Sequence, residues 1–284
     1  MKKFIKKILL LMFLSIIFIE SMCYLFLVTD LYLFNYSGQE VYRSIFKSKQ
    51  KNKAKVLVLG DSVGYQLFPN NRCIDKINSL ACNQSIGMSG HFLLLNNYLN
   101  SGNKIDYVYL VYRPFSFKNN LDQVYTYHYF LKPFNLPEYI DLFTETVKKQ
   151  IEKIPYRKFC RIPHILATSW APNFVSEDKN DFTFLSPISV EYIKKIVELS
   201  IKHKFKFFIL PAPLSSETKG LLDKINKNEI STHKLENEFK DYFKNLVILD
   251  DSLFWEGGIH LREPDKFSEK YKNMLNFQYE NKSK

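Results

Sequence analysis

The chain has 284 residues and a formal net charge of +11, from 40 lysines and arginines against 29 aspartates and glutamates. The basic residues are scattered and form no dense stripe interleaved with aromatics, so a nucleic-acid partner is not expected. A positive charge of this size favours anionic lipids or envelope polymers instead. The length suits one domain with a full-sized core.

The N-terminus combines a basic start with a long apolar run. Residues 1–7 hold four lysines, and residues 8–28 are apolar apart from two serines and a glutamate. At about 1.5 Å per residue such a run is long enough to cross a bilayer, and no small-x-small cleavage site follows it. We therefore expect residues 1–34 to be a cytoplasmic basic tail and an uncleaved, single-pass transmembrane anchor, with the rest of the chain outside the cytoplasm.

A lysine-rich stretch separates this anchor from the remainder of the chain. Between Phe46 and Lys55, lysines alternate with mostly polar residues, a pattern that cannot bury a core. The pattern predicts a solvated linker over residues 35–54 and a domain over residues 55–284.

Strand-like runs alternate with helical patterns along residues 55–284. The predicted strands are Val56–Leu59, Ile77–Asn83, Ile105–Tyr112, Phe205–Leu210 and Leu246–Leu249, and the clearest helices are Val190–Leu199 and Glu263–Leu275. Alternating strands and helices imply a parallel sheet covered on both faces. The expected fold class is therefore α/β, a three-layer sandwich around a central parallel sheet of flavodoxin-like type.

The segment at about residues 117–187 interrupts this alternation. It is irregular and rich in aromatic residues, among them Tyr125, Tyr127 and Tyr129. Insertions at the carboxyl edge of such a sheet commonly shape the substrate pocket, so we interpret it as a lid or specificity insertion. Its aromatics could stack on sugar rings, although packing within the insertion's own small core is the better interpretation.

Ser62 stands where the first predicted strand breaks into a helix. Gly60 is expected to permit a tight turn there, which would hold the serine hydroxyl at the carboxyl edge of the sheet, where a nucleophile is useful. Alternatively, Ser62 simply caps the helix. The Gly60–Gly64 segment also fits the G-x-S-x-G elbow of α/β-hydrolases, but that elbow comes after several strands and this one follows the first.

Gly60-Asp61-Ser62 after a first strand, together with His260-Leu261 near the C-terminus, resembles the SGNH/GDSL family of esterases and acyltransferases. The resemblance extends from Lys55 onward, except for the insertion. It implies that Ser62 is the nucleophile and His260 its general base, with neither a cofactor nor a metal ion.

The resemblance also suggests which groups would hold the oxyanion. The amide of Ser62 is one candidate, and the segment around Gln84 resembles the family's second block, in which a glycine amide helps. Gly87 is the first choice for that glycine and Gly90 the second. The family's third block brings an asparagine that is missing here, where Arg113 could supply donors instead.

The second departure concerns the partner of the histidine. The family places an aspartate three residues before it, and that position is Gly257 in this chain. We expect Glu256 to orient His260, with Asp250 and Asp251 as nearby substitutes. A Ser-His dyad without a carboxylate is also possible.

The cysteines leave two alternatives open. Cys73 and Cys82 could close a small disulfide loop in an oxidising compartment, or they could be free and buried. A metal site is not expected, because no histidines cluster with them.

Three functions are compatible with these residues. The first is a membrane-anchored, extracytoplasmic serine esterase acting on acyl esters of an envelope glycan or lipid through an acyl-enzyme intermediate. The second is an O-acyltransferase of cell-surface polysaccharide with the same covalent chemistry. The third is a noncatalytic glycan-binding or assembly protein with a degenerate site.

Overall fold

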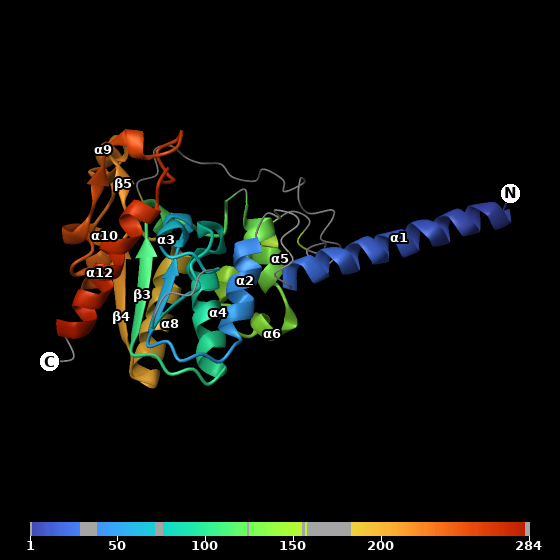
Figure 1. The fold of residues 1–284 in the computed structure, drawn as a ribbon, viewed down its shortest axis with the longest axis horizontal. Coiled ribbons are helices and arrows are strands. Elements are labelled where there is room, and N and C mark those ends of the chain that lie inside the picture. Colours follow the sequence, from blue (N-terminus) through green and yellow to red (C-terminus); the bar gives the residue numbers. More distant parts are fainter. Residues whose placement is uncertain are drawn as a thin grey trace.

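A parallel sheet of four strands, in the order β2-β1-β3-β4, lies at the centre of the domain. Figure 1 labels its neighbouring strands β3 and β4. The structure is a computed structural model, and it describes residues 2–28, 39–71, 76–123, 125–154, 157 and 183–281. The strands are β1 (Val56–Gly60), β2 (Ile77–Ser79), β3 (Tyr107–Tyr112), β4 (Lys206–Pro211), β5 (Leu214–Ser215) and β6 (Ile248–Leu249). The central sheet agrees with the α/β class expected from the alternating pattern.

Twelve α-helices are described among these residues. They are α1 (Lys2–Val28), α2 (Gln39–Ser48), α3 (Ser62–Leu67), α4 (Gly87–Asn100), α5 (Lys132–Phe134), α6 (Pro137–Ile140), α7 (Glu145–Lys153), α8 (Pro187–His203), α9 (Lys219–Leu222), α10 (Asn228–Thr232), α11 (Glu236–Phe239) and α12 (Asp265–Asn281). The predicted helices Val190–Leu199 and Glu263–Leu275 correspond to α8 and α12.

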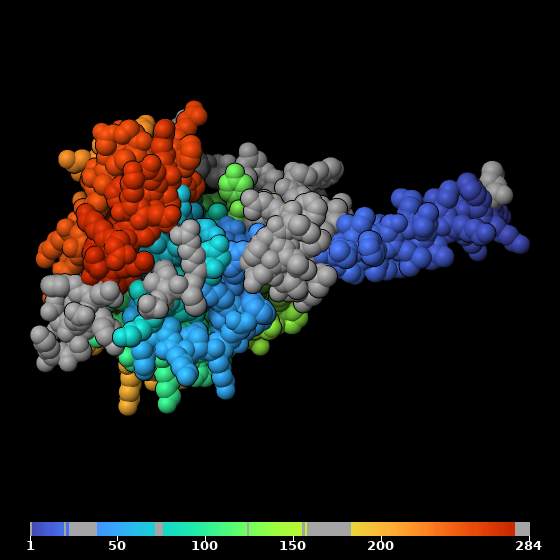
Figure 2. All heavy atoms as spheres, in the orientation of Figure 1, coloured from blue at the N-terminus to red at the C-terminus, as the bar shows by residue number. Residues whose placement is uncertain are grey.

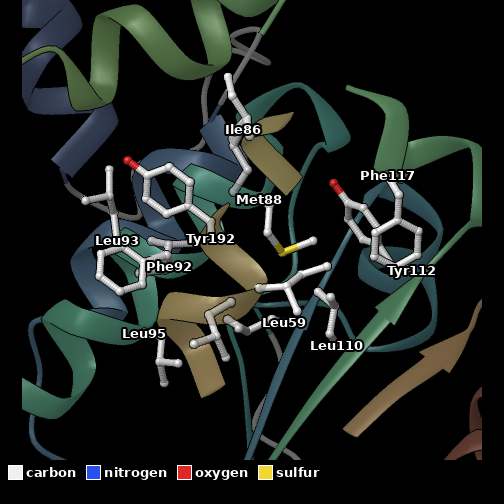
Figure 3. Packing of buried hydrophobic residues seen from close by; sticks show 14 of the residues in the cluster. Leu59, Ile86, Met88, Phe92, Leu93, Leu95, Leu110, Tyr112, Phe117 and Tyr192 are labelled. Atoms are coloured by element: carbon white, nitrogen blue, oxygen red, sulfur yellow. The ribbon is translucent and has the colours of Figure 1, made fainter. Parts of the chain in front are cut away.

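The two faces of the sheet carry two separate apolar clusters. In β3, Val108 and Leu110 belong to one cluster and Tyr109 and Val111 to the other, because successive side chains of a strand point to opposite faces. The larger cluster includes residues of α4 and α8 (Figure 3), and the smaller one includes residues of α3 and α12. Helices therefore cover both faces, an arrangement that fits a three-layer sandwich.

The last predicted strand does not join this sheet. Within Leu246–Leu249 only β6 forms, and it pairs with β5 in a separate two-stranded parallel sheet. Pro211 ends β4 and Pro213 follows two residues later. Since proline has no backbone N–H to donate, the central ladder is interrupted before β5 begins.

The segment expected to be a solvated linker is part of the fold. Residues 39–48 form α2, in which Val41 and Ser44 are buried and the Ser44 hydroxyl donates to the Leu80 carbonyl at 3.0 Å. The Lys47 ammonium donates to the carbonyls of Asn70 at 2.8 Å and Ser79 at 3.0 Å. Lysine spacing suggested solvation, but this lysine instead ties α2 to the end of β2.

The transmembrane span expected at residues 8–28 is not found. Figures 1 and 2 show α1 leaving the rest of the chain as a single rod. No helix among the described residues combines the length and the apolar character that a membrane crossing requires.

Part of the predicted insertion can be compared with the structure. Tyr127, Phe130, Phe134 and Tyr139 are buried, but they belong to the larger apolar cluster together with residues of the central sheet, so the separate small core expected for the insertion is not found among the described residues. Most of residues 155–182 lie outside the described residues. Cys82 is free and buried, whereas Cys73 and Cys160 lie outside the described residues.

Gly60 and Gly64 bring α3 close against β3. A Cβ atom at Gly64 would lie 2.6 Å from the Val111 carbonyl oxygen, and one at Gly60 would lie 2.7 Å from the same oxygen. Gly60 is the last residue of β1 and its φ is not positive, but a Cβ atom there would also lie 3.1 Å from the Gly64 Cα atom, so the turn into α3 is as tight as the sequence suggested. Both glycines also allow backbone segments to approach closely.

We expect Gly64→Ala to lower the free energy of unfolding by about 1–3 kcal/mol, because the added methyl group must displace backbone. Denaturant unfolding monitored by circular dichroism measures this loss. Gly220→Ala is the matched control: it lies in α9 with nothing within 4 Å of its Cβ position and should be neutral or slightly stabilising. Equal stability of the Gly64 variant and the unmodified chain would contradict the close approach.

Candidate functional site

The candidate site lies at the carboxyl ends of β1 and β3. The chain passes from β1 to β2 on one side and from β2 to β3 on the other side of β1, so the strand order reverses between β1 and β3. Crevices at such a reversal, outside the carboxyl ends of parallel strands, are the usual ligand sites of open α/β sheets. Ser62 follows β1 and Arg113 follows β3, so both lie at this edge of the sheet, where the strand order reverses.

Ser62 and His260 meet across the site, although 198 residues separate them in the sequence. The His260 Nε2 atom lies 3.0 Å from the Ser62 hydroxyl oxygen. This distance is within the range over which an imidazole can accept the proton of a serine nucleophile. The structure thus brings together the two residues that the sequence singled out first.

The residue that caps α3 is Asp61, not Ser62. The Asp61 Oδ1 atom accepts from the amides of Val63 at 3.0 Å and Gly64 at 3.1 Å. Its Oδ2 atom accepts from the Arg113 amide at 2.8 Å and from the Ser116 hydroxyl at 2.7 Å. The alternative in which Ser62 is simply a helix cap is therefore wrong, and the Ser62 hydroxyl is left for other contacts.

His260 is carried by a hairpin whose far end is a glycine turn. Phe254 and Leu261 form an antiparallel bridge, and the Trp255 amide donates to the His260 carbonyl at 2.8 Å. Gly257 and Gly258 have φ values of +92° and +63°, which strongly favour glycine. An aspartate at position 257, as in the family pattern, would be strained in this turn.

The expected orienting carboxylates do not reach His260. Glu256 is exposed, and among the described residues no hydrogen bond joins a carboxylate to the His260 ring. Asp250 accepts from the amide and hydroxyl of Ser252, and Asp251 accepts from the Glu217 amide at 3.0 Å. The geometry corresponds to the Ser-His dyad that the sequence left open, and the expectation for Glu256 is not met.

The backbone amides proposed as oxyanion donors differ in whether they already donate a hydrogen bond within the chain. The Gly87 amide donates to the Gln84 carbonyl, and Gly90 lies within α4 with its Cβ position against Ile86. In the described part of the chain, the Ser62 amide at the start of α3 has no hydrogen-bond partner. Ser62 is therefore better placed to donate than either glycine.

Arg113 is the buried cation of the site. Only 5% of its surface is exposed, and its Nε atom has no hydrogen-bond partner among the described residues. Burial lowers the pKa of Arg113 while the nearby Asp61 carboxylate raises it, and arginine stays charged at any pH of interest.

The pKa of His260 lies below its usual value of 6.5. Partial burial of the imidazole is the largest cause, the Arg113 charge lowers the pKa further, and Asp61 opposes both. A lowered pKa keeps the imidazole neutral, and so able to accept a proton, in more acidic solution than usual.

Comparisons with known proteins add no assignment. Neither a model of a known protein family nor a curated protein matches the chain. The resemblance to SGNH/GDSL hydrolases therefore depends on the residues of this chain alone.

Sequence analysis missed two residues that border the site. Ser116, which donates to Asp61, lies in the short helical turn Pro114–Lys118 after β3 and carried no motif. Gln66 lies four residues after Ser62 on α3 and contacts the backbone of Leu261. The spacing of four residues, which puts Gln66 on the Ser62 side of the helix, was the one signal available for it.

We expect Arg113→Gln to raise the pKa of His260, because the variant removes a positive charge that disfavours the imidazolium ion. The acid limb of any reaction that needs neutral His260 should then move to higher pH. Titration of the His260 ring protons by NMR measures the pKa directly, with His260→Gln used to assign the signals. Arg113→Lys keeps the charge and serves as the control; a His260 pKa that is unchanged or lower in Arg113→Gln would contradict this assignment.

Proposed function

We propose that the chain is a serine esterase of SGNH/GDSL type that acts on acyl esters of an envelope glycan or lipid. The observation that carries the proposal is the 3.0 Å separation of His260 Nε2 and the Ser62 hydroxyl oxygen at the carboxyl edge of the sheet. A serine hydroxyl is a weak nucleophile until a neighbouring base takes its proton. This contact is the arrangement that such activation needs.

In the proposed reaction the Ser62 oxygen attacks the ester carbonyl carbon while His260 Nε2 takes the hydroxyl proton. The carbonyl oxygen becomes an oxyanion, for which the Ser62 amide and the Arg113 guanidinium are the candidate donors. When the tetrahedral intermediate collapses, the alcohol leaves with the proton from His260 and the acyl group stays on Ser62. Water, activated by His260, then attacks the acyl-enzyme and releases the acid.

The surroundings of His260 support an acylated glycan or lipid as substrate. Trp255 is 57% exposed and pairs with His260 in the hairpin, opposite the buried face formed by Phe254 and Leu261. The Arg262 guanidinium lies 5.5 Å from the centre of the Trp255 ring. An exposed aromatic ring beside the base can contact a sugar ring or an acyl chain, and the adjacent cation favours an anionic group.

The two alternative functions make different demands. An O-acyltransferase would use the same acyl-enzyme but pass the acyl group to a sugar hydroxyl, so it requires an acceptor site that excludes water. A noncatalytic glycan-binding protein would not need an imidazole within hydrogen-bonding distance of the serine, and the Ser62–His260 contact therefore favours an enzyme.

Labelling with a fluorophosphonate probe should modify the unmodified chain at Ser62. We expect both Ser62→Ala and His260→Ala to abolish this labelling, and the double variant to be scarcely different from either single one, because residues that act as a unit are non-additive. Ser231→Ala, at an exposed serine of α10, is the control and should label normally. Labelling of Ser62→Ala at the full rate, with circular dichroism showing a folded chain, would overturn the assignment.

We also propose that α1 attaches the domain to a membrane. Large apolar side chains are exposed along this helix, among them Phe4, Leu11 and Phe18 at 66–67%. Four lysines at its N-terminus provide charges that attract anionic headgroups. The extracytoplasmic location of the domain stays a prediction from the lysine cluster.

Replacing Leu11 and Phe18 together with lysine should shift the full chain from the membrane pellet to the supernatant after cell lysis. Both side chains are exposed, so the substitutions remove apolar surface that would contact the membrane and do not disturb the packing of a core. Ile201→Lys, at a position of α8 that is 74% exposed, is the matched control and should stay in the pellet. A double variant that remains in the pellet would show that α1 is not the attachment.

A further inference from the structure

Gln66 holds the backbone next to His260 through two hydrogen bonds. Its side-chain Nε2 atom donates to the Leu261 carbonyl at 3.0 Å, and its Oε1 atom accepts from the Leu261 amide at 2.9 Å. Both ends of the amide are therefore used on one residue. Together with the contact between His260 and Ser62, these are the hydrogen bonds that join α3 to the His260 hairpin in the described chain.

Gln66, which makes these two hydrogen bonds, lies on the same helix as the proposed nucleophile Ser62. Gln66 is four residues after Ser62, about one turn further along α3, so both side chains leave the same side of the helix. Leu261 directly follows His260 in the chain. Holding the Leu261 backbone in place therefore also holds the Cα atom of His260, from which the imidazole side chain extends. The same short helix thus carries the serine and the group that locates its base.

His260 needs its backbone to be held in this way because no carboxylate among the described residues bonds to its ring. In Ser-His-Asp sites a carboxylate on the far ring nitrogen holds the imidazole in place. Here no carboxylate among the described residues does so, and the hairpin ends in two consecutive glycines. His260 itself has the bond from the Trp255 amide to its carbonyl and the contact of its ring with Ser62. Its neighbour Leu261 adds to these contacts: Leu261 is fully buried, and its amide and carbonyl both bond to Gln66.

We propose that Gln66 is a positioning residue, which replaces the missing carboxylate by holding His260 through the backbone rather than through its ring. The inference rests on the proposed function of Ser62 and His260. It differs from a merely structural role because Gln66 should matter to the reaction only when His260 is present.

The test compares Gln66→Met, which keeps the length but loses both hydrogen bonds, with Gln66→Asn, which keeps the amide on a shorter chain that cannot reach both Leu261 groups. We expect the rate of fluorophosphonate labelling of Ser62, and kcat on p-nitrophenyl acetate, to fall roughly 10- to 100-fold in each variant, with KM within about twofold, because displacing a reacting group by about 1 Å costs this much.

Asn103→Leu is the control for the loss of a side-chain amide that holds backbone groups away from the site. Asn103 donates to the carbonyls of Gln50 and Tyr98 and accepts from the Asn52 amide, far from the site in the chain. Its variant should lose stability, measured by thermal unfolding, and keep the labelling rate of the unmodified chain. This separates a loss of position at His260 from a general loss of stability.

The decisive comparison is made in the His260→Ala background with free imidazole added as an external base. There Gln66→Met should cause no further loss of labelling, because Gln66 acts through the tethered histidine. A further loss as large as in the unmodified background would overturn the inference, as would full activity of both Gln66 variants. If the unmodified chain does not label at all, the proposed function itself fails, whatever the Gln66 variants do.

Discussion

The site depends first on the buried carboxylate of Asp61. Four donors converge on it: two amides of α3, the Arg113 amide at the end of β3, and the Ser116 hydroxyl. A fully buried carboxylate without partners would cost several kcal/mol, whereas hydrogen bonds to a charged group contribute about 1.5–3 kcal/mol each. Asp61 therefore joins the helix that carries the nucleophile to the strand that carries the cation, and the close approach at Gly60 and Gly64 leaves α3 little freedom to shift.

Much of the central sheet could be predicted from residue patterns. The runs that became β1, β3 and β4 are short, apolar and rich in β-branched or aromatic residues, and buried parallel strands need little else to be recognised. Ser62 and His260 were also found, because a serine at a strand-to-helix junction and a histidine in a distal block form a recognisable pair. Their meeting at 3.0 Å follows from the fold, since the carboxyl end of β1 is where the C-terminal hairpin returns.

The roles of Lys47, Glu256 and Gln66 could not be predicted from the sequence, for reasons that the structure shows. The lysine spacing around α2 suggested a solvated segment. The spacing could not show that the Lys47 ammonium donates to the backbone carbonyls of Asn70 and Ser79 in the folded chain. Glu256 was favoured on proximity along the chain, which ignores the positive φ values of the following glycines and the exposure of its side chain. The role of Gln66 required knowing that Leu261 lies beside α3, a contact across 195 residues that no local motif encodes.

The glycine turn of the His260 hairpin limits where its tip can vary. The bond from the Trp255 amide to the His260 carbonyl closes the hairpin below the turn, and Gly257 has nothing within 4 Å of its Cβ position. Residues 256–259 thus form a loop closed at its base, in which the positive φ values restrict Gly257 and Gly258 whereas the side chains of Glu256 and Ile259 are exposed. Exchanges at the exposed Glu256 and Ile259 would therefore alter what this tip presents to solvent while the contact between the Ser62 hydroxyl and the His260 ring is retained.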